Sequence, residues 1–216
     1  MAGEKWGVDS ASPVTENLYQ CVNEQFGQPA FWGRYIKRVE GYADGLTLQE
    51  IRFLQDKGIR ILPIYSDFRN ATGYRSGKVT ARNAIYHARL LNMPAGVFLF
   101  ANIEHFFEVD ESWLRGWVEA MYPSGYRPGF YHDPARGPFA EAYCRAASQD
   151  PLVREQAVLW SASPLPGPSP ASQAPKFQPA KPACGANVWA WQYGKDAEAC
   201  PIDTNLMDKK LYRHLW

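Results

Sequence analysis

The most constraining feature of the sequence is the apolar run GVFLFANIE at residues 96–104. At the strand period of two, one face of this run is purely aliphatic, and the other is apolar until it ends in Asn102 and Glu104. A strand that is apolar on both faces is typical of a parallel sheet covered by helices. Because α/β proteins place their chemistry at the carboxyl ends of such strands, we expect Asn102 and Glu104 in the floor of a cleft. The alternative is a strand that simply emerges into solvent.

Seven further short apolar runs resemble this one, and most of the early ones are separated by helical patterns. The expected strands are residues 6–9, 31–35, 59–65, 96–104, 127–131, 156–160, 189–193 and 201–205, and the expected helices are residues 14–26, 48–57, 76–91, 113–121 and 139–147. A doubly wound sheet would also alternate, but no glycine-rich phosphate loop follows the first run, and a count of eight favours closure. The sequence therefore predicts a (β/α)₈ TIM barrel, an α/β fold, as a single domain over residues 1–216.

The pattern is irregular on the side between strands six and eight. Residues 163–183 carry seven prolines, so no sixth helix can form, and we expect a mobile loop near the cleft, as a lid or a plain insertion. Only residues 194–200 connect the last two runs, too few for a full helix. Cys184 and Cys200 each precede one of these neighbouring strands, so we expect a disulfide between them, with Cys21 and Cys144 as buried thiols in helices.

Composition excludes several functional classes. The net charge of +1 does not indicate nucleic acid or an anionic membrane surface, and no run approaches the roughly 18 apolar residues of a membrane span. The four cysteines lack paired C-x-x-C spacing, so neither zinc nor another cofactor is expected. Residues 1–6 lack the basic and apolar regions of a signal peptide, which indicates a trimmed leader or another export route. Eight Trp, 12 Tyr and 11 Phe are consistent with a heavy core or with sugar binding.

Polar residues lie near the ends of several expected strands. In a barrel they would gather at one mouth: Asp9, Tyr65, Asp67, Asn102, Glu104, Tyr131, Trp160, Gln192, Asp203 and Asn205. Acids that converge in an aromatic cleft suit glycoside hydrolysis, in which a protonated carboxyl donates to the leaving oxygen. Glu104 is the natural acid, because apolar side chains beneath it would favour its protonated form. Arg34 is a candidate partner for one of the acids, and His132 could line the cleft.

Several motifs in order resemble a known family. The segments GRY at 33–35, GLTLQE at 45–50, GIRILPIY at 58–65 and residues 73–104 resemble the glycoside-hydrolase-like domains of domain-of-unknown-function family 1906. The ends of the chain resemble the family 25 glycoside hydrolases, the barrel lysozymes: GVDS at 7–10, GFY at 129–131, VLW at 158–160, WQY at 191–193 and IDTN at 202–205. The resemblance covers most of the chain outside the proline-rich segment.

The lysozyme resemblance implies cleavage of the β-1,4 bond after N-acetylmuramic acid in peptidoglycan. It also implies a secreted, periplasmic or cell-wall-associated protein, which we expect to be a monomer. By position Glu104 takes the role of the acid, and Asp9 and Asp203 match supporting acids. Asn102 stands where that family has Asp, and an amide cannot stabilise a developing cation by charge. Two hypotheses follow: a muramidase-like enzyme, or a glycan-binding barrel that lost turnover through Asn102.

If the chain is an enzyme, its second carboxylate must come from another strand. Asp9 and Asp203 lie on strands that face the Glu104 strand across a closed barrel. We therefore expect a separation in the range of roughly 6.5–9.5 Å, which implies an inverting reaction or one assisted by the substrate acetamide.

Overall fold

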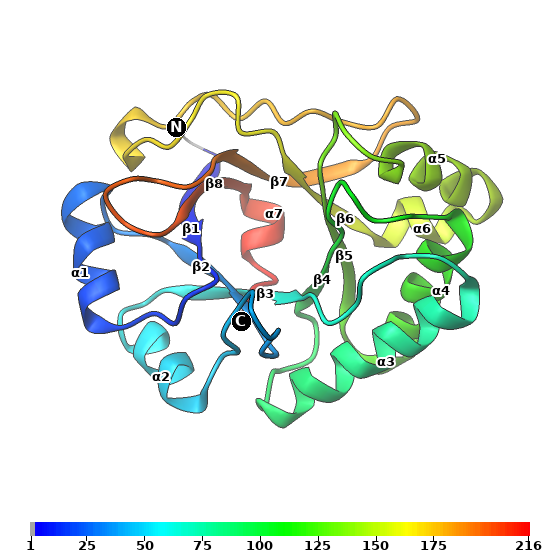
Figure 1. Ribbon diagram of the computed structural model, residues 1–216, viewed down its shortest axis with the longest axis horizontal. Coiled ribbons are helices and arrows are strands. Elements are labelled where there is room, and N and C mark those ends of the chain that lie inside the picture. The colour runs from blue at the N-terminus through cyan, green and yellow to red at the C-terminus, as the bar shows by residue number, and fades with distance from the viewer. Residues whose placement is uncertain (1–2) are drawn as a thin grey trace.

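Eight strands close into one barrel, in which each strand is hydrogen-bonded to the next and the last to the first. The computed structural model describes residues 3–216, so Met1 and Ala2 of the predicted domain lie outside the described residues. The strands are β1 Glu4–Asp9, β2 Phe31–Tyr35, β3 Arg60–Tyr65, β4 Phe98–Asn102, β5 Arg127–His132, β6 Val158–Ala162, β7 Asn187–Gly194 and β8 Asp203–Asp208 (Figure 1). The predicted barrel is confirmed.

Helices pack around the outside of this ring (Figure 1). They are α1 Glu16–Gln25, α2 Leu48–Asp56, α3 Tyr74–Leu90, α4 Glu111–Met121, α5 Phe139–Gln149 and the short α6 Pro151–Gln156, with 3-10 turns η1 Tyr122–Ser124 and η2 Ala171–Gln173. Side chains of Thr15, Thr47 and Asp110 cap α1, α2 and α4 by accepting backbone N–H groups of the first turn. The sequence reading missed α6 and placed Gln156 in a strand, whereas Gln156 ends this helix.

The last strand runs against the others. β8 pairs antiparallel with both β7 and β1, and Asp9 lies opposite Asp203 in the β1–β8 register. A parallel connection needs a dozen or more residues, and the segment between Gly194 and Asp203 is shorter than that, so the chain turns straight back. As a result Asp203 reaches the mouth from the beginning of its strand, whereas we expected it near the end of residues 201–205.

Two apolar layers hold the barrel together. The inner layer fills the lumen with side chains such as Leu62, Phe100 and Met207, and it continues into α7, Lys209–Tyr212, which lies within the ring outline in Figure 1. The outer layer lies between the strands and helices and contains the stacked Trp113 and Trp117 rings, whose centroids are 5.6 Å apart. The lumen is therefore filled up to the mouth, where polar side chains take over.

The proline-rich segment, residues 163–183, is irregular as predicted, apart from η2. Its backbone is held by an N–H of Ala171 that donates to the Phe26 carbonyl at 2.8 Å and an N–H of Gly167 that donates to the Tyr193 carbonyl at 3.1 Å. It runs along the outside of the barrel from β6 to β7 (Figure 1). Among residues 3–216, the lining of the two mouth cavities comes from other segments, so the lid hypothesis has no support. The start of the segment nevertheless lies beside the cleft, because Gly167 and Pro168 pack against Gly194, the neighbour of the cleft residue Lys195.

The cysteine prediction was also wrong. The disulfides are Cys21–Cys200, with Cα atoms 6.1 Å apart, and Cys144–Cys184, with Cα atoms 5.6 Å apart. Because β8 is antiparallel, Cys200 precedes β8 at the mouth, whereas Cys184 precedes β7 at the opposite end of the barrel. Each therefore bonds a cysteine of the helix beside it. No helix within residues 3–216 is long and apolar enough to cross a membrane.

Candidate active site

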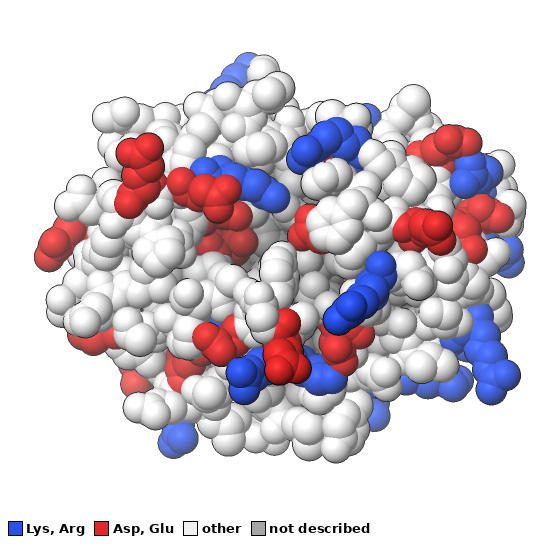
Figure 2. Space-filling view, in the orientation of Figure 1, with Lys and Arg blue, Asp and Glu red and all other residues white. Residues whose placement is uncertain are grey.

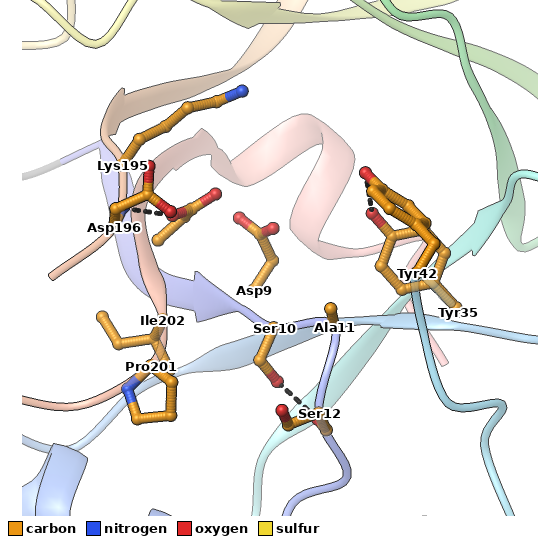
Figure 3. A pocket seen from close by; sticks show the side chains of 11 residues that line it. Asp9, Ser10, Ala11, Ser12, Tyr35, Tyr42, Lys195, Asp196, Pro201 and Ile202 are labelled. Carbon is orange, nitrogen blue, oxygen red and sulfur yellow. Dashed lines mark hydrogen bonds between the residues drawn. The ribbon is translucent and has the colours of Figure 1, made fainter. Parts of the chain in front are cut away.

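The mouth of the barrel holds two adjoining cavities, of about 320 Å³ and about 50 Å³. Both are lined by Asp9, Tyr35, Tyr42, Lys195 and Asp203, so they form one continuous cleft. Figure 2 shows acidic side chains around a hollow in this face, and Figure 3 shows Asp9 between the tyrosine side and the lysine side of the cleft. The predicted gathering of acids at one mouth is present.

Two carboxyls that share one amide donor, those of Asp9 and Asp203, form the floor on the β1–β8 side. Gln192 Nε2 donates to Asp9 Oδ1 at 3.1 Å and to Asp203 Oδ2 at 2.8 Å. One nitrogen therefore holds both acids, and these two oxygens are at most about 6 Å apart. Asn205 Nδ2 adds a second donor to Asp9 Oδ1 at 2.6 Å.

The aromatic residues of the neighbouring strands fix the two amides. The Tyr131 hydroxyl donates to Gln192 Oε1 at 2.9 Å, and Trp160 Nε1 donates to Asn205 Oδ1 at 2.9 Å. Each amide oxygen is thus occupied by a donor, so each amide nitrogen must point at the acids. Of these groups Asn205 is fully buried beneath the cleft, where it supports Asp9 without lining the cavity.

Burial controls the protonation of this carboxyl pair. Burial, followed by the nearby Asp203 charge, raises the pKa of Asp9 from 3.8 to about 8, and the donors Asn205 and Gln192 oppose this. Burial likewise raises the pKa of Asp203 from 3.8 to about 6, against the Asp196 backbone N–H that donates to it at 2.7 Å. Burial and the repulsion between the two carboxyls therefore favour a proton on this pair at a pH where an exposed carboxyl is ionised.

Glu104 lies across the cleft from this pair, two residues past the end of β4. Its Oε1 accepts from Asn102 Nδ2 at 3.1 Å and from the Tyr42 hydroxyl at 3.2 Å. The same Asn102 nitrogen donates to Ser66 Oγ at 3.0 Å, and Asn102 itself is buried. Among the described residues no side chain or backbone group bonds Glu104 Oε2, and Glu104 lines the smaller of the two cavities. The burial that the sequence suggested for Glu104 is found instead at Asp9, which is buried among polar side chains, whereas Glu104 is half-buried.

The cleft also contains residues that the sequence analysis does not predict, among them Tyr35, Tyr42 and Lys195. The hydroxyls of Tyr35 and Tyr42 lie 3.2 Å apart and form one wall, and the Lys195 ammonium lies 5.6 Å from the centroid of the Tyr131 ring. Tyr35 could have been found, because it follows Phe31 at even spacing on the inward face of β2. Tyr42 and Lys195 come from loops, where periodicity gives no signal.

Some predicted site residues lie elsewhere. Tyr65 was placed at the mouth wrongly: its neighbour Ile64 points into the lumen, so Tyr65 points outward and stacks on Phe68 among the helices. Asp67 pairs with Lys37 outside the two cavities. His132 is fully buried, its ring centroid 4.3 Å from that of Phe139, and burial lowers its pKa from 6.5 to about 4.

Arg34 does not pair with a cleft acid. Its guanidinium is fully buried on the outward face of β2, where Nε donates to Glu50 Oε1 at 2.6 Å. It also donates to the Ser10 and Ala11 carbonyls at 2.7 and 3.0 Å, which fixes the chain just after Asp9. Glu50 completes this arrangement by accepting the Val14 N–H at 2.9 Å. This ion pair holds the β1 loop in place and belongs to the support of the cleft.

The arrangement suits proton transfer and hydrolysis more than metal or nucleophilic serine chemistry. Within residues 3–216 no group of three or more His, Cys, Asp or Glu side chains could hold a metal ion. Two carboxyls whose pKa values are raised by burial, and a third acid with one oxygen that makes no hydrogen bond among the described residues, line one cleft. Groups with separated pKa values can give and take protons in the same reaction.

Family membership is decided by a match to the Rv2525c-like, glycoside hydrolase-like domain, which covers residues 29–176. The chain belongs to this family. A crystal structure of an uncharacterized B. stearothermophilus protein resembles this glycoside hydrolase-like chain throughout: the identity is 54%, the match covers 98% of this chain and 100% of that one, and the TM-score is 0.97.

More distant structures share the fold of this glycoside hydrolase-like domain. The catalytic domain of endolysin ply40 from bacteriophage P40 of Listeria monocytogenes is 14% identical, with 99% of this chain and 97% of that chain covered and a TM-score of 0.61. A family GH25 lysozyme from Aspergillus fumigatus is also 14% identical, with 97% and 98% covered and a TM-score of 0.55. At this identity the likeness shows the fold alone. No curated protein matches the chain.

Proposed function

We propose that this protein is a glycoside hydrolase that cleaves cell-wall glycan, with peptidoglycan as the substrate class. The observation that carries the proposal is the convergence of Asp9, Asp203 and Glu104 on one cleft with tyrosine walls. Hydrolysis of a glycosidic bond needs one carboxyl that donates a proton and a second group that acts on the other side of the sugar. The lysozymes and endolysins of similar fold support the same class of reaction.

Glu104 acts as the general acid in this proposal. Asn102 and Tyr42 fix Oε1, so the remaining oxygen can carry the proton to the leaving glycosidic oxygen. Asn102 positions this acid by a neutral hydrogen bond, and it brings no second charge to that side of the cleft. The Ser66 hydroxyl, bonded to the same nitrogen, holds Asn102 in this orientation.

Asp203 is the better candidate for the second carboxylate. Asp203 is half-buried whereas Asp9 is buried, and burial, which raises the pKa of both carboxyls, opposes the charged form more strongly at Asp9. Asp203 can therefore act as a base towards water or support a substrate acetamide, and Asp9 supports it through the shared Gln192 donor. A wide separation from Glu104, and with it inversion or acetamide assistance, remains part of this proposal.

A second candidate is a glycan-binding barrel without turnover. Asn102 favours it, because the amide stands where the barrel lysozymes have a second acid beside Glu104. Both candidate functions involve binding of cell-wall glycan in the same cleft. The two disulfides support an extracellular, cell-wall-associated place of action for either one.

Release of reducing ends from purified peptidoglycan separates the two candidates. We expect the wild-type protein to release them and Glu104→Gln to lose at least about a hundredfold in rate, since the variant removes the transferable proton and keeps the shape. Glu108→Gln is the matched control, because Glu108 is an exposed neighbour outside both cavities. Full activity in Glu104→Gln contradicts the proposal, and binding to peptidoglycan without any release by the wild type supports the binding barrel.

A further inference from the structure

A third cavity lies at the opposite end of the barrel from the mouth. It has a volume of about 340 Å³ and includes Phe98, Arg127 and Val158 in its lining. Phe98, Arg127 and Val158 are the first residues of β4, β5 and β6, whereas the cleft lies at the last residues of these strands. We call this cavity the base pocket. It shares no lining residue with the mouth cavities.

A β-bulge aims an indole ring into the base pocket. In the β6–β7 ladder Leu159 lies opposite Val188 and Trp160 opposite Ala190, so Trp189 is the additional residue on β7. A bulge re-aims a side chain that regular pairing would direct elsewhere. The Trp189 ring stays partly exposed, and it meets the Phe98 ring edge to face at a centroid distance of 6.2 Å. The Lys210 ammonium lies over the Trp189 ring, 5.9 Å from its centroid, so the ring lies between this cation and the pocket that it lines.

A second aromatic ring lines the other side. Tyr122 follows directly after α4 at the start of η1, and it is 73% exposed although it is a large ring. The Tyr122 ring is not part of the hydrophobic core, and η1 contributes no buried residue. Two rings from separate segments, Trp189 and Tyr122, therefore face solvent in one cavity.

Three planar polar side chains surround these rings. Arg127, Glu155 and Gln156 line the base pocket, and across the described residues their side chains make no hydrogen bond or ion pair. The Arg127 guanidinium lies over the Phe98 ring at 5.7 Å from its centroid. The guanidinium, carboxylate and amide therefore keep their donors and acceptors for a ligand, and the opposite charges of Arg127 and Glu155 suit a ligand without strong net charge.

We propose that the base pocket is a second saccharide-binding site, which holds a pyranose ring of a β-1,4-linked glycan. The apolar C–H face of a pyranose packs on flat aromatic rings, and its hydroxyls exchange hydrogen bonds with planar polar groups. Such a site binds without cleaving, because the pocket has one carboxyl, Glu155, and hydrolysis needs a second group. It would hold the protein on a polymer while the mouth engages another part of that polymer. The inference does not require hydrolysis at the mouth.

The test follows the tryptophan indole N–H signals by NMR in the full chain carrying Glu104→Gln, titrated with the β-1,4-linked tetramer of N-acetylglucosamine. Trp189→Phe identifies the Trp189 signal. We expect this signal to shift saturably, and we expect Tyr122→Ser and Arg127→Gln each to weaken that binding roughly threefold to tenfold. Tyr86→Ser, the same change at an exposed tyrosine on α3, should leave the affinity unaltered.

A Trp189 signal that does not respond to the tetramer overturns the inference, as does an unchanged affinity in both Tyr122→Ser and Arg127→Gln. If the Trp189 signal shifts but the wild-type protein releases no reducing ends, the proposed hydrolysis is contradicted and the base pocket is still supported as a saccharide site. If the wild type releases reducing ends but the Trp189 signal does not shift, the base pocket inference is contradicted and hydrolysis at the mouth is still supported.

Discussion

Asp9→Asn replaces a buried carboxyl of the cleft by a neutral amide of nearly the same shape. Burial and the nearby Asp203 raise the pKa of Asp9 from 3.8 to about 8, so between these pH values the folded protein keeps a proton that the unfolded chain has lost. Unfolding then releases a proton, and the free energy of unfolding falls as pH rises. One proton corresponds to about 1.4 kcal/mol per pH unit, or about 3 kcal/mol between pH 5 and pH 7.

The asparagine variant lacks this proton in both states. The oxygen of the introduced amide can still accept from Gln192 and Asn205, which donate to Asp9 Oδ1 in the wild type. We therefore expect the wild type to lose about 3 kcal/mol relative to Asp9→Asn as pH rises from 5 to 7, because the other titrating groups are common to both proteins.

Urea unfolding of both proteins at pH 5, 6 and 7 measures this difference. The control is Asp56→Asn, since Asp56 is exposed at the end of α2 and its removal should leave the pH dependence of the wild type unchanged. A difference between wild type and Asp9→Asn that stays flat across this range would refute the protonated state of Asp9. A difference that grows in the opposite direction would refute it as well.

Three further perturbations test the support of the cleft. Arg34→Leu leaves the buried Glu50 carboxylate without its partner, and we expect the free energy of unfolding to fall by about 3–5 kcal/mol in urea titrations. Replacing Cys21 and Cys200 by serine removes a disulfide that links residues 179 positions apart, and loop entropy predicts a fall of about 5 kcal/mol in the free energy of unfolding. We expect this variant to have a lower Tm than a variant in which Cys144 and Cys184 are replaced by serine. Asn102→Asp removes the amide that donates to Glu104 Oε1 at 3.1 Å and so positions the general acid, and we expect at least about a tenfold lower rate of reducing-end release. A rise from a near-zero rate would instead indicate a lapsed enzyme.

The barrel could be predicted from the sequence because each strand is short, apolar and separated by helical periodicity or prolines. The direction of β8 could not be predicted in this way, because a strand shows the same apolar pattern whether it runs parallel or antiparallel to its neighbours. The connection after Gly194 is too short for a helix, and the same length is too short for a parallel crossover, so β8 turns back along β7. The predicted Cys184–Cys200 disulfide requires a parallel β8, whereas the antiparallel direction moves Cys200 to the mouth and away from Cys184.

The acids of the site were predicted because they stand at strand ends, where position along the chain fixes position in space. Tyr65 was misplaced by one step of the strand alternation, which decides whether a side chain enters the lumen or the helix layer. Tyr42 and Lys195 depend on loop conformation, and no periodicity describes a loop. The pKa shifts could not be predicted either, because the surroundings of Asp9 at the cleft include Gln192 and Asn205 from two other strands.

The most direct test of a hydrolytic cleft is digestion of purified peptidoglycan in water enriched in oxygen-18, followed by mass spectrometry of the released fragments. We predict one heavy oxygen at each new reducing end with the wild-type protein, and no labelled fragments with Glu104→Gln, because water is the second substrate and Glu104 delivers the proton. Fragments without the label, or labelled fragments in equal yield from Glu104→Gln, would contradict hydrolysis at this site.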